Sequence, residues 1–261
     1  GEWFDGYSAR GPWEETYHGA RVFRAREWPR KGNTSVNIFL NYISWPLYAA
    51  AALHRLPGGY DAVFCFNTSP VLMCWPAVRY ARKHHIPFTN YVLDLWPENL
   101  YSVLPVQNGA LRAVAQKVSD SLYKKADRLI AMSEPLQQRL CQRTGKSPRQ
   151  VAAIPQYCED FYAVPQRDAA LEAQFGGRFN LVFTGTMTPA QSLDMVLRAV
   201  LDARAAGAEN LHLLLVGDGM SRESLQALAR ELNAGDAVTF YGSVPAREIP
   251  KFTALADALL I

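Results

Sequence analysis

The sequence predicts an α/β protein made of two domains, each built on a parallel sheet. Apolar runs of about six residues alternate with amphipathic stretches of roughly ten to sixteen, the rhythm of parallel strands joined by crossover helices. The length of 261 residues corresponds to one or two domains at ~150 residues each. The rhythm lapses between Cys158 and Gly177, where Pro165 and a glycine pair stand. We therefore expect one domain over residues 1–165 and a second over residues 166–261.

Each element follows from its local pattern. The apolar runs predict strands at residues 61–66, 88–93, 128–132, 151–154, 180–184, 211–216, 238–241 and from 258 onward. Three helices have a start signal, a capping hydroxyl directly before a proline or one residue earlier: Ser69-Pro70, Ser133-Glu134-Pro135 and Thr188-Pro189. An amphipathic helix is expected over about residues 111–125.

Composition excludes several classes. Hydrophobic residues make up 49% and charged residues 20% of the chain, which is typical of globular proteins and argues against disorder. Subtracting 24 acidic from 27 basic residues leaves a net charge of +3, too balanced to indicate a nucleic-acid partner. The longest uninterrupted apolar stretch, residues 45–53, is shorter than the ~20 residues of a membrane span. No export signal is visible, and we expect a cytoplasmic protein.

The cysteines and histidines do not form a metal pattern. Cys65, Cys74, Cys141 and Cys158 contain no CxxC pair and lie in or beside apolar segments, which suits reduced, partly buried thiols. His84-His85 is expected to end a helix, and none of the histidines stands at metal-ligand spacing. The sequence therefore predicts neither a zinc site nor a disulfide framework.

Glycine follows all three visible strands of the second half. A parallel sheet binds ligands beyond the carboxyl ends of its strands, where Gly185, Gly217, Gly219 and Gly242 are expected. Glycine lets the backbone approach a ligand, and the helix beginning near Thr188 offers N–H groups to an anion such as a nucleoside diphosphate. A single such glycine is equally explained by the strand-to-helix turn alone. The segment at Gly217 is not a G-x-G-x-x-G fingerprint, so a nicotinamide cofactor is disfavoured.

In the first half, two carboxylates follow a predicted strand. Asp94 and Glu98 flank Trp96-Pro97, so an acid or base is expected where a substrate hydroxyl would lie. The structural alternative is that Glu98 caps the next helix and Asp94 holds the loop. Farther along, the helix over residues 111–125 has a basic face that suits either anionic lipid or solvent, formed by Arg112, Lys117, Lys124 and Lys125.

With these segments in place, the chain resembles the retaining glycosyltransferases of group 1, or family 4, which have the GT-B fold. The matching segments run in the family's order: YVLDLWPE at 91–98, ADRLIAMS at 126–133, IPQYCED at 154–160, LVFTG at 181–185, LLLVGDG at 213–219 and VTFYGSVP at 238–245. The DLWPE variant is most similar to the branch that builds bacterial surface polysaccharides.

The resemblance implies two facing Rossmann-like domains with parallel sheets, the second truncated. The first would hold the acceptor and the second the nucleotide-sugar, without a metal or other cofactor. It assigns the nucleobase to the loop of Tyr241, Gly242, Ser243 and Val244, and the diphosphate to the turn at Gly185.

The chain also departs from the family pattern. Many members have an arginine and a lysine that pair with the diphosphate, where this chain has Thr186 and Gln191, and a histidine where it has Leu93. The family's paired-glutamate motif would follow Ile261, and its glycine-rich loop would precede Gly1. Because the chain starts without Met and ends within a predicted strand, we expect a fragment of a longer protein, inactive by itself.

The predicted function is transfer of a sugar from a nucleotide-sugar, with retention of configuration, in surface-polysaccharide (lipopolysaccharide-type) biosynthesis. The resemblance implies a polyprenyl-diphosphate-linked saccharide acceptor and peripheral contact with the inner membrane. Asp94 and Glu98 are the predicted catalytic residues. Gly185, Thr186, Gln191, Gly217, Gly219 and the loop from Tyr241 to Val244 are the predicted donor-binding residues. Two alternatives remain: a nucleotide-sugar epimerase of similar architecture, and a non-catalytic two-lobed scaffold.

Overall fold

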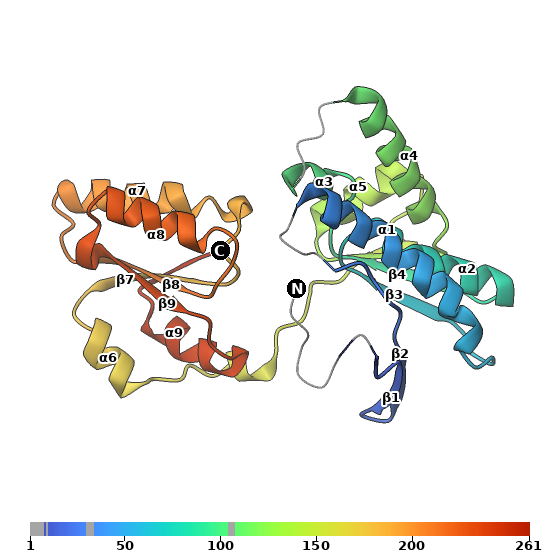
Figure 1. Cartoon of the computed structure of the whole chain (residues 1–261), viewed down its shortest axis with the longest axis horizontal. Coiled ribbons are helices and arrows are strands. Elements are labelled where there is room, and N and C mark those ends of the chain that lie inside the picture. Colours follow the sequence, from blue (N-terminus) through green and yellow to red (C-terminus); the bar gives the residue numbers. More distant parts are fainter. Residues whose placement is uncertain (1–7, 9, 30–33, 104–107) are drawn as a thin grey trace. The chain divides into compact units, whose positions relative to one another are not determined.

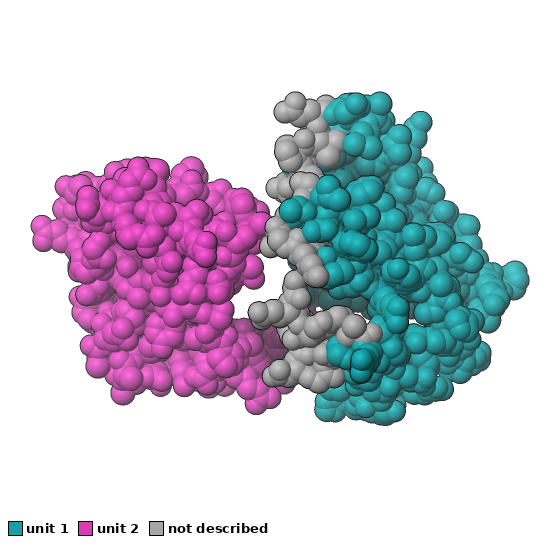
Figure 2. All heavy atoms as spheres, in the orientation of Figure 1, with its two compact units in different colours: residues 1–156 teal, residues 157–261 magenta. Residues whose placement is uncertain are grey.

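The chain folds into two compact units, Gly1–Gln156 and Tyr157–Ile261 (Figure 2). The computed structural model describes residue 8 and residues 10–29, 34–103 and 108–261. The division lies nine residues before the joint predicted after residue 165. The reason is that the short 3-10 turn at Asp160–Tyr162 packs against helix α9 (Ile249–Leu255) of the second unit.

The first unit is built on a four-stranded parallel sheet of order β3-β4-β5-β6 (Figure 1). The strands are β3 (Val63–Asn67), β4 (Phe88–Val92), β5 (Arg128–Ala131) and β6 (Val151–Ala153), each within two residues of its predicted bounds. In the register, Asn90 of β4 stands between Cys65 of β3 and Leu129 of β5. The first strands of the chain were not predicted: β1 (Glu14–Tyr17) and β2 (Ala20–Phe23) form an antiparallel hairpin.

Helices cover one face of this sheet. They are α2 (Trp75–His84), the short α3 (Glu98–Val103), α4 (Gly109–Lys124) and α5 (Glu134–Thr144), and their apolar sides enclose a core that includes Phe88, Tyr123, Leu129 and Leu140. Alternate residues of β3 point to the opposite face, where Phe64 and Phe66 are exposed. The amphipathic helix predicted over residues 111–125 is α4, and α2 ends at His84 as expected.

Helix α1 (Ser35–Ala52) packs against α2 and the 3-10 turn Val71–Cys74. The window Val36–Arg55 is long and apolar enough, by length and composition, to cross a membrane. This window is longer than the uninterrupted apolar run at residues 45–53, because it also includes apolar residues on the N-terminal side of that run. Most of the window is not buried within the unit, and Val36, Phe39 and Leu47 are exposed.

The second unit has a four-stranded parallel sheet of order β10-β7-β8-β9. Its strands are β7 (Phe179–Thr184), β8 (Leu211–Val216), β9 (Val238–Gly242) and β10 (Ala258–Leu260), as predicted. Helices α7 (Leu193–Ala205) and α8 (Arg222–Glu231) lie on one face, and α6 (Ala169–Phe175) and α9 on the other (Figure 1). Because both faces are covered, β8 is buried along almost its whole length, which explains its unbroken apolar run.

The three predicted helix starts have different outcomes. Ser133 caps α5 by accepting a hydrogen bond from the Leu136 N–H at 3.4 Å, as predicted. Thr188 caps only a 3-10 turn, Pro189–Gln191, and α7 begins later at Leu193. The prediction for Ser69 is wrong: the turn after it has Pro70 at its N-cap and no side-chain cap, and the Ser69 hydroxyl instead accepts a hydrogen bond from the Trp96 indole N–H at 3.1 Å.

Candidate functional site

The predicted donor site lies at the carboxyl edge of the second unit's sheet. Strands β7, β8 and β9 are neighbours and end side by side, so their exits meet. The Gly185 N–H donates to the Val216 carbonyl at 3.0 Å, and the Gly217 N–H donates to the Gly242 carbonyl at 2.8 Å. The structure therefore brings together the four glycines that the sequence singled out on three separate strand exits.

Two of these glycines are required by the close approach of the loops. A Cβ on Gly217 would lie 1.9 Å from the Gly185 carbonyl oxygen, and a Cβ on Gly219 would lie 2.3 Å from the Met187 carbonyl oxygen. The Gly219 N–H donates to the Asp218 carboxylate at 2.7 Å. The N–H groups of Gly185, Gly217 and Gly219 therefore all have intramolecular partners.

The remaining predicted donor residues fall into two groups. Thr186, Gln191 and Ser243 are exposed beside these exits, although the Gln191 side-chain oxygen already accepts from the Thr188 N–H at 3.0 Å. Tyr241, which is also exposed, and Val244 contact α9. The Tyr241 ring packs edge-on against Phe252 with 4.6 Å between centroids, and Val244 is partly buried in the same cluster.

One charged residue at this edge was missed. Arg222, the first residue of α8, forms an ion pair with Asp218 at 3.3 Å. The sequence contained a signal for it. A basic residue in the first helical turn after a glycine-rich strand exit is expected close to the diphosphate predicted to bind there.

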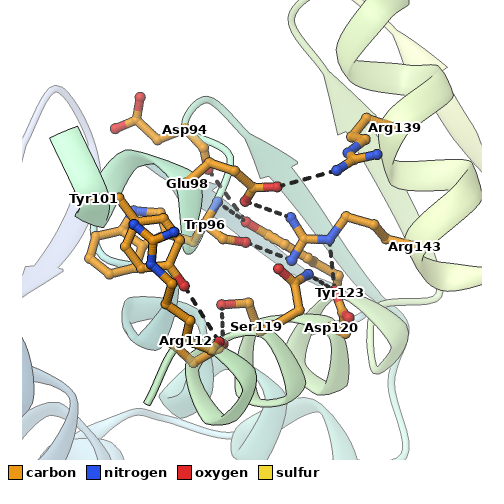
Figure 3. A network of polar contacts seen from close by, with 12 residues as sticks. Asp94, Trp96, Glu98, Tyr101, Arg112, Ser119, Asp120, Tyr123, Arg139 and Arg143 are labelled. Carbon is orange, nitrogen blue, oxygen red and sulfur yellow. Dashed lines mark hydrogen bonds and ion pairs between the residues drawn. The ribbon is translucent and has the colours of Figure 1, made fainter. Parts of the chain in front are cut away.

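In the first unit, Asp94 and Glu98 have different surroundings (Figure 3). The Asp94 carboxyl group points away from the ion pairs of the loop. Burial raises its pKa above the usual range, an effect that a hydrogen bond with Asn99 partly offsets. A carboxyl group with a raised pKa suits proton exchange with a substrate hydroxyl.

Glu98 is held by cations. Its carboxylate accepts from Arg143 Nη1 at 3.0 Å and lies 3.9 Å from Arg139 Nη2, both on α5. It is also the first residue of α3, where the positive end of the helix dipole stabilises a carboxylate. This environment matches the structural alternative for Glu98 more closely than the acid–base role.

Arg143 connects three segments and was not identified from the sequence. Its guanidinium also donates to Asp120 of α4 at 2.7 Å and to the Trp96 carbonyl at 2.7 Å, and it lies over the Tyr123 ring at 5.3 Å (Figure 3). Only 6% of its side chain is exposed. A lone arginine within a helix gives no local signal for such a role.

Hydrogen bonds with Tyr123 and Ser69 also hold the loop from Asp94 to Glu98 in place. The Trp96 N–H donates to the Tyr123 hydroxyl at 3.0 Å, and that hydroxyl donates to the Asp94 carbonyl at 3.4 Å. Burial raises the pKa of Tyr123 above its usual range, so the hydroxyl keeps its proton. The backbone from Asp94 to Glu98 is thus fixed before any ligand binds, as a positioned acid or base requires.

A basic pocket of about 460 Å³ lies between α2 and α4. It is lined by Arg82, Lys117, Asp120, Ser121, Lys124 and Lys125. Its carboxylate, Asp120, is paired with Arg143, and no acidic partner is recorded for its four cations within the described part of the chain. The pocket therefore attracts anions.

Potential metal ligands are scattered. Among residues 8, 10–29, 34–103 and 108–261, no three His, Cys, Asp or Glu side chains are grouped as a metal site would require. All four cysteines are free: Cys65 and Cys74 are buried, Cys141 is half-buried, and Cys158 is exposed rather than partly buried. Burial raises the pKa of Cys65 to about 12, so this thiol is not poised as a nucleophile.

Similarity to known proteins agrees with this architecture. Residues 7–156, more than half of the chain, match the model of Glycosyltransferase Family 4, and residues 168–261 match that of Glycosyl transferases group 1. A curated relative from Mycolicibacterium smegmatis, a GDP-mannose-dependent alpha-(1-6)-phosphatidylinositol monomannoside mannosyltransferase, is 27% identical over 214 residues. That match covers 80% of this chain but 52% of the relative, so the chain spans about half the relative's length.

Two solved structures share the fold. Anabaena HepE in complex with UDP has a TM-score of 0.61 at 17% identity, with 85% of this chain and 57% of HepE covered. WaaG, a glycosyltransferase involved in lipopolysaccharide biosynthesis, has a TM-score of 0.61 at 15% identity, with 89% and 60% covered. Both halves of the chain therefore match one family in sequence and in GT-B fold: the chain belongs to glycosyltransferase family 4, in the group 1 glycosyl transferases.

Proposed function

We propose that this chain carries the donor and acceptor domains of a glycosyltransferase that moves a sugar from a nucleoside-diphosphate sugar to an acceptor hydroxyl. The observation that carries the proposal is the meeting of the β7, β8 and β9 exits at one edge of the second unit, in a chain of this family. Open parallel sheets bind nucleotides at such edges. The UDP complex of HepE and the GDP-mannose dependence of the mycobacterial relative support a nucleotide-sugar donor.

The chemistry requires two tasks. The departing diphosphate must be stabilised as negative charge develops on it, a task for cations and N–H groups at the donor site. The acceptor hydroxyl must be positioned and lose its proton, for which Asp94 is the proposed residue because its carboxyl group forms no ion pair with any described residue and burial raises its pKa. We further propose retention of anomeric configuration, as the family resemblance implies, and no metal or other cofactor.

The acceptor is proposed to be a lipid-linked saccharide at a membrane surface, linked to polyprenyl diphosphate as the family resemblance implies. The mycobacterial relative is named for a phosphatidylinositol acceptor, and WaaG for lipopolysaccharide biosynthesis. In this chain, Leu111, Val114 and Val118 are exposed on α4, close in sequence to the lysines of the basic pocket. A helix with exposed apolar residues and adjacent cations suits an anionic lipid surface.

The family matches favour transfer over epimerisation, and nucleotide binding distinguishes transfer from a scaffold. Both family models that match describe glycosyltransferases, which supports sugar transfer rather than epimerisation. A non-catalytic scaffold predicts no nucleotide binding, so a binding measurement separates it from the transferase.

The test is calorimetric titration of the chain with UDP, GDP and inorganic phosphate. We expect micromolar binding of one nucleotide. Thr186→Trp, at an exposed strand exit, should abolish it, while Glu209→Trp, an exposed residue before the opposite end of β8, should not. Failure of the folded chain to bind either nucleotide, or equal effects of the two tryptophans, would contradict the donor site.

A further inference from the structure

Arg222 occupies a distinctive place at the carboxyl edge of the second sheet. Its Nη1 lies 3.3 Å from the Asp218 carboxylate, and its Nη2 lies 3.7 Å from the point where a Cβ of Gly242 would stand. The guanidinium therefore lies between the exits of β8 and β9. Its Nε is buried without a hydrogen-bond partner, although 30% of the side chain remains exposed.

Among the described residues, the other predicted donor-site residues carry no positive charge, and Arg247 after the β9 exit is the alternative cation. Thr186 and Gln191 are uncharged, and the N–H groups of Gly185, Gly217 and Gly219 are already bonded within the chain. A nucleoside diphosphate has at least two negative charges, which need a compensating cation in a site with few free donors. Elsewhere in the unit, Lys251 pairs with Glu248 and Asp168, and both Arg178 and Arg204 pair with Asp236.

Arg222 has donors to spare. A guanidinium has five N–H donors in a planar fork, of which Asp218 takes one at a distance typical of a loose ion pair. Because this pair is partly exposed, it contributes little by itself, and sharing the guanidinium with a phosphate costs little. The contact with Asp218 instead restricts the side chain to the edge where the strands end.

We propose that Arg222 binds the diphosphate of the nucleotide-sugar donor and supplies the positive charge that Thr186 and Gln191 do not. This role rests on the proposed function of the second unit as the donor site. A Cβ at Gly242 would lie in ordinary contact with the Arg222 guanidinium, and the φ of +97° is what favours glycine there.

The test compares ligands that differ only in their phosphates. Uridine and UDP, and guanosine and GDP, are titrated into the wild type and into Arg222→Gln. Loss of a charge-assisted hydrogen bond should weaken binding of the nucleoside diphosphate about 10- to 100-fold. Binding of the matching nucleoside should be unchanged, and Arg222→Lys should recover part of the loss.

Two controls locate the effect. Arg230→Gln removes an exposed cation from the last turn of the same helix and should change neither affinity. Arg247→Gln removes the exposed cation that follows the β9 exit. A larger loss for Arg247→Gln than for Arg222→Gln would overturn the proposal.

Other outcomes separate the two hypotheses. Equal weakening of nucleoside and diphosphate by Arg222→Gln would indicate a structural role and overturn the proposal, and so would unchanged affinity. In both cases wild-type nucleotide binding leaves the proposed function standing. Absence of nucleotide binding by the folded wild type would reject the proposed function and this role together.

Discussion

Arg143 is the residue that fixes the Asp94–Glu98 loop to the rest of the first unit. Three hydrogen bonds from one guanidinium of α5 reach Asp120 of α4 and, in the loop and the start of α3, the Trp96 carbonyl and Glu98. A planar fork can satisfy three acceptors at once, which a lysine cannot do in the same geometry. The acceptor-side loop thus depends on a residue that itself need not touch a substrate.

Replacing Arg143 with methionine should destabilise the first unit by about 2 kcal/mol or more. The change leaves the Asp120 and Glu98 carboxylates without their buried partner, and removing one member of such a network is costly. Urea unfolding measures the change. Arg139→Met is the matched control on the same helix: its pair with Glu98 is exposed and 3.9 Å long, so about 0.5 kcal/mol or less is expected. Equal effects of the two substitutions would contradict the assignment.

At the scale of elements, a buried histidine connects three strands of the second sheet. His212 of β8 is fully buried, with Nδ1 2.9 Å from Asn180 Oδ1 of β7 and Nε2 2.9 Å from Thr239 Oγ of β9. The Asn180 amide nitrogen donates to the Phe175 carbonyl, so its oxygen faces the ring and Nδ1 carries the proton. Nε2 then accepts from Thr239, which makes the neutral ring the matching form.

His212 should make the second unit lose stability in mild acid. Burial, with a contribution from Arg178, lowers the pKa of His212 from 6.5 to about 4. Between these values the unfolded chain binds the proton and the folded unit does not, so stability is full above about pH 6.5 and falls towards pH 4. Urea unfolding followed from pH 7 to 4 should show a smaller decline for His212→Gln than for wild type.

The control for this titration is His85→Gln, at an exposed histidine of the first unit. Its pH profile should follow that of the wild type. If His212→Gln declines as steeply as wild type over this range, the acid sensitivity comes from other groups.

At the scale of the whole molecule, each unit has its own sheet, core and candidate binding region. The proposed donor residues lie in the second unit, and Asp94, the basic pocket and the exposed apolar face of α4 belong to the first. For the proposed lipid-linked acceptor, that face of α4 is the proposed membrane contact.

Membrane contact predicts selective binding to anionic vesicles. The chain should cosediment with phosphatidylglycerol-containing vesicles and only weakly with pure phosphatidylcholine, and salt should reduce binding. Each lysine near such a surface contributes about 1 kcal/mol, so Lys117→Glu with Lys124→Glu should weaken binding about 10-fold or more. Lys146→Glu with Arg149→Glu makes the same charge change elsewhere and should have a smaller effect. Equal losses would point to net charge rather than to α4.

The sequence was sufficient to predict the strands of both parallel sheets, because the signals for a strand are local. Apolar periodicity located every strand of both parallel sheets within two residues, and the glycines at the strand exits indicated which edge to consider. The β1–β2 hairpin and the helix starts at Ser69 and Thr188 were missed. At Ser69 the hydroxyl is bonded by the Trp96 indole, which comes from a distant segment.

By itself, then, the sequence determined the two-unit α/β architecture, the order of its strands and helices, and the family resemblance. Only the tertiary structure decided how the candidate residues are used. In the folded chain the N–H groups of the strand-exit glycines donate hydrogen bonds to other residues of the chain. Glu98 pairs with Arg143, which lies 45 residues away, and Arg222 lies beside Gly242. The physical reason is that a strand or helix follows from neighbouring residues, whereas the charge and free donors of a site depend on contacts between segments that only folding brings together.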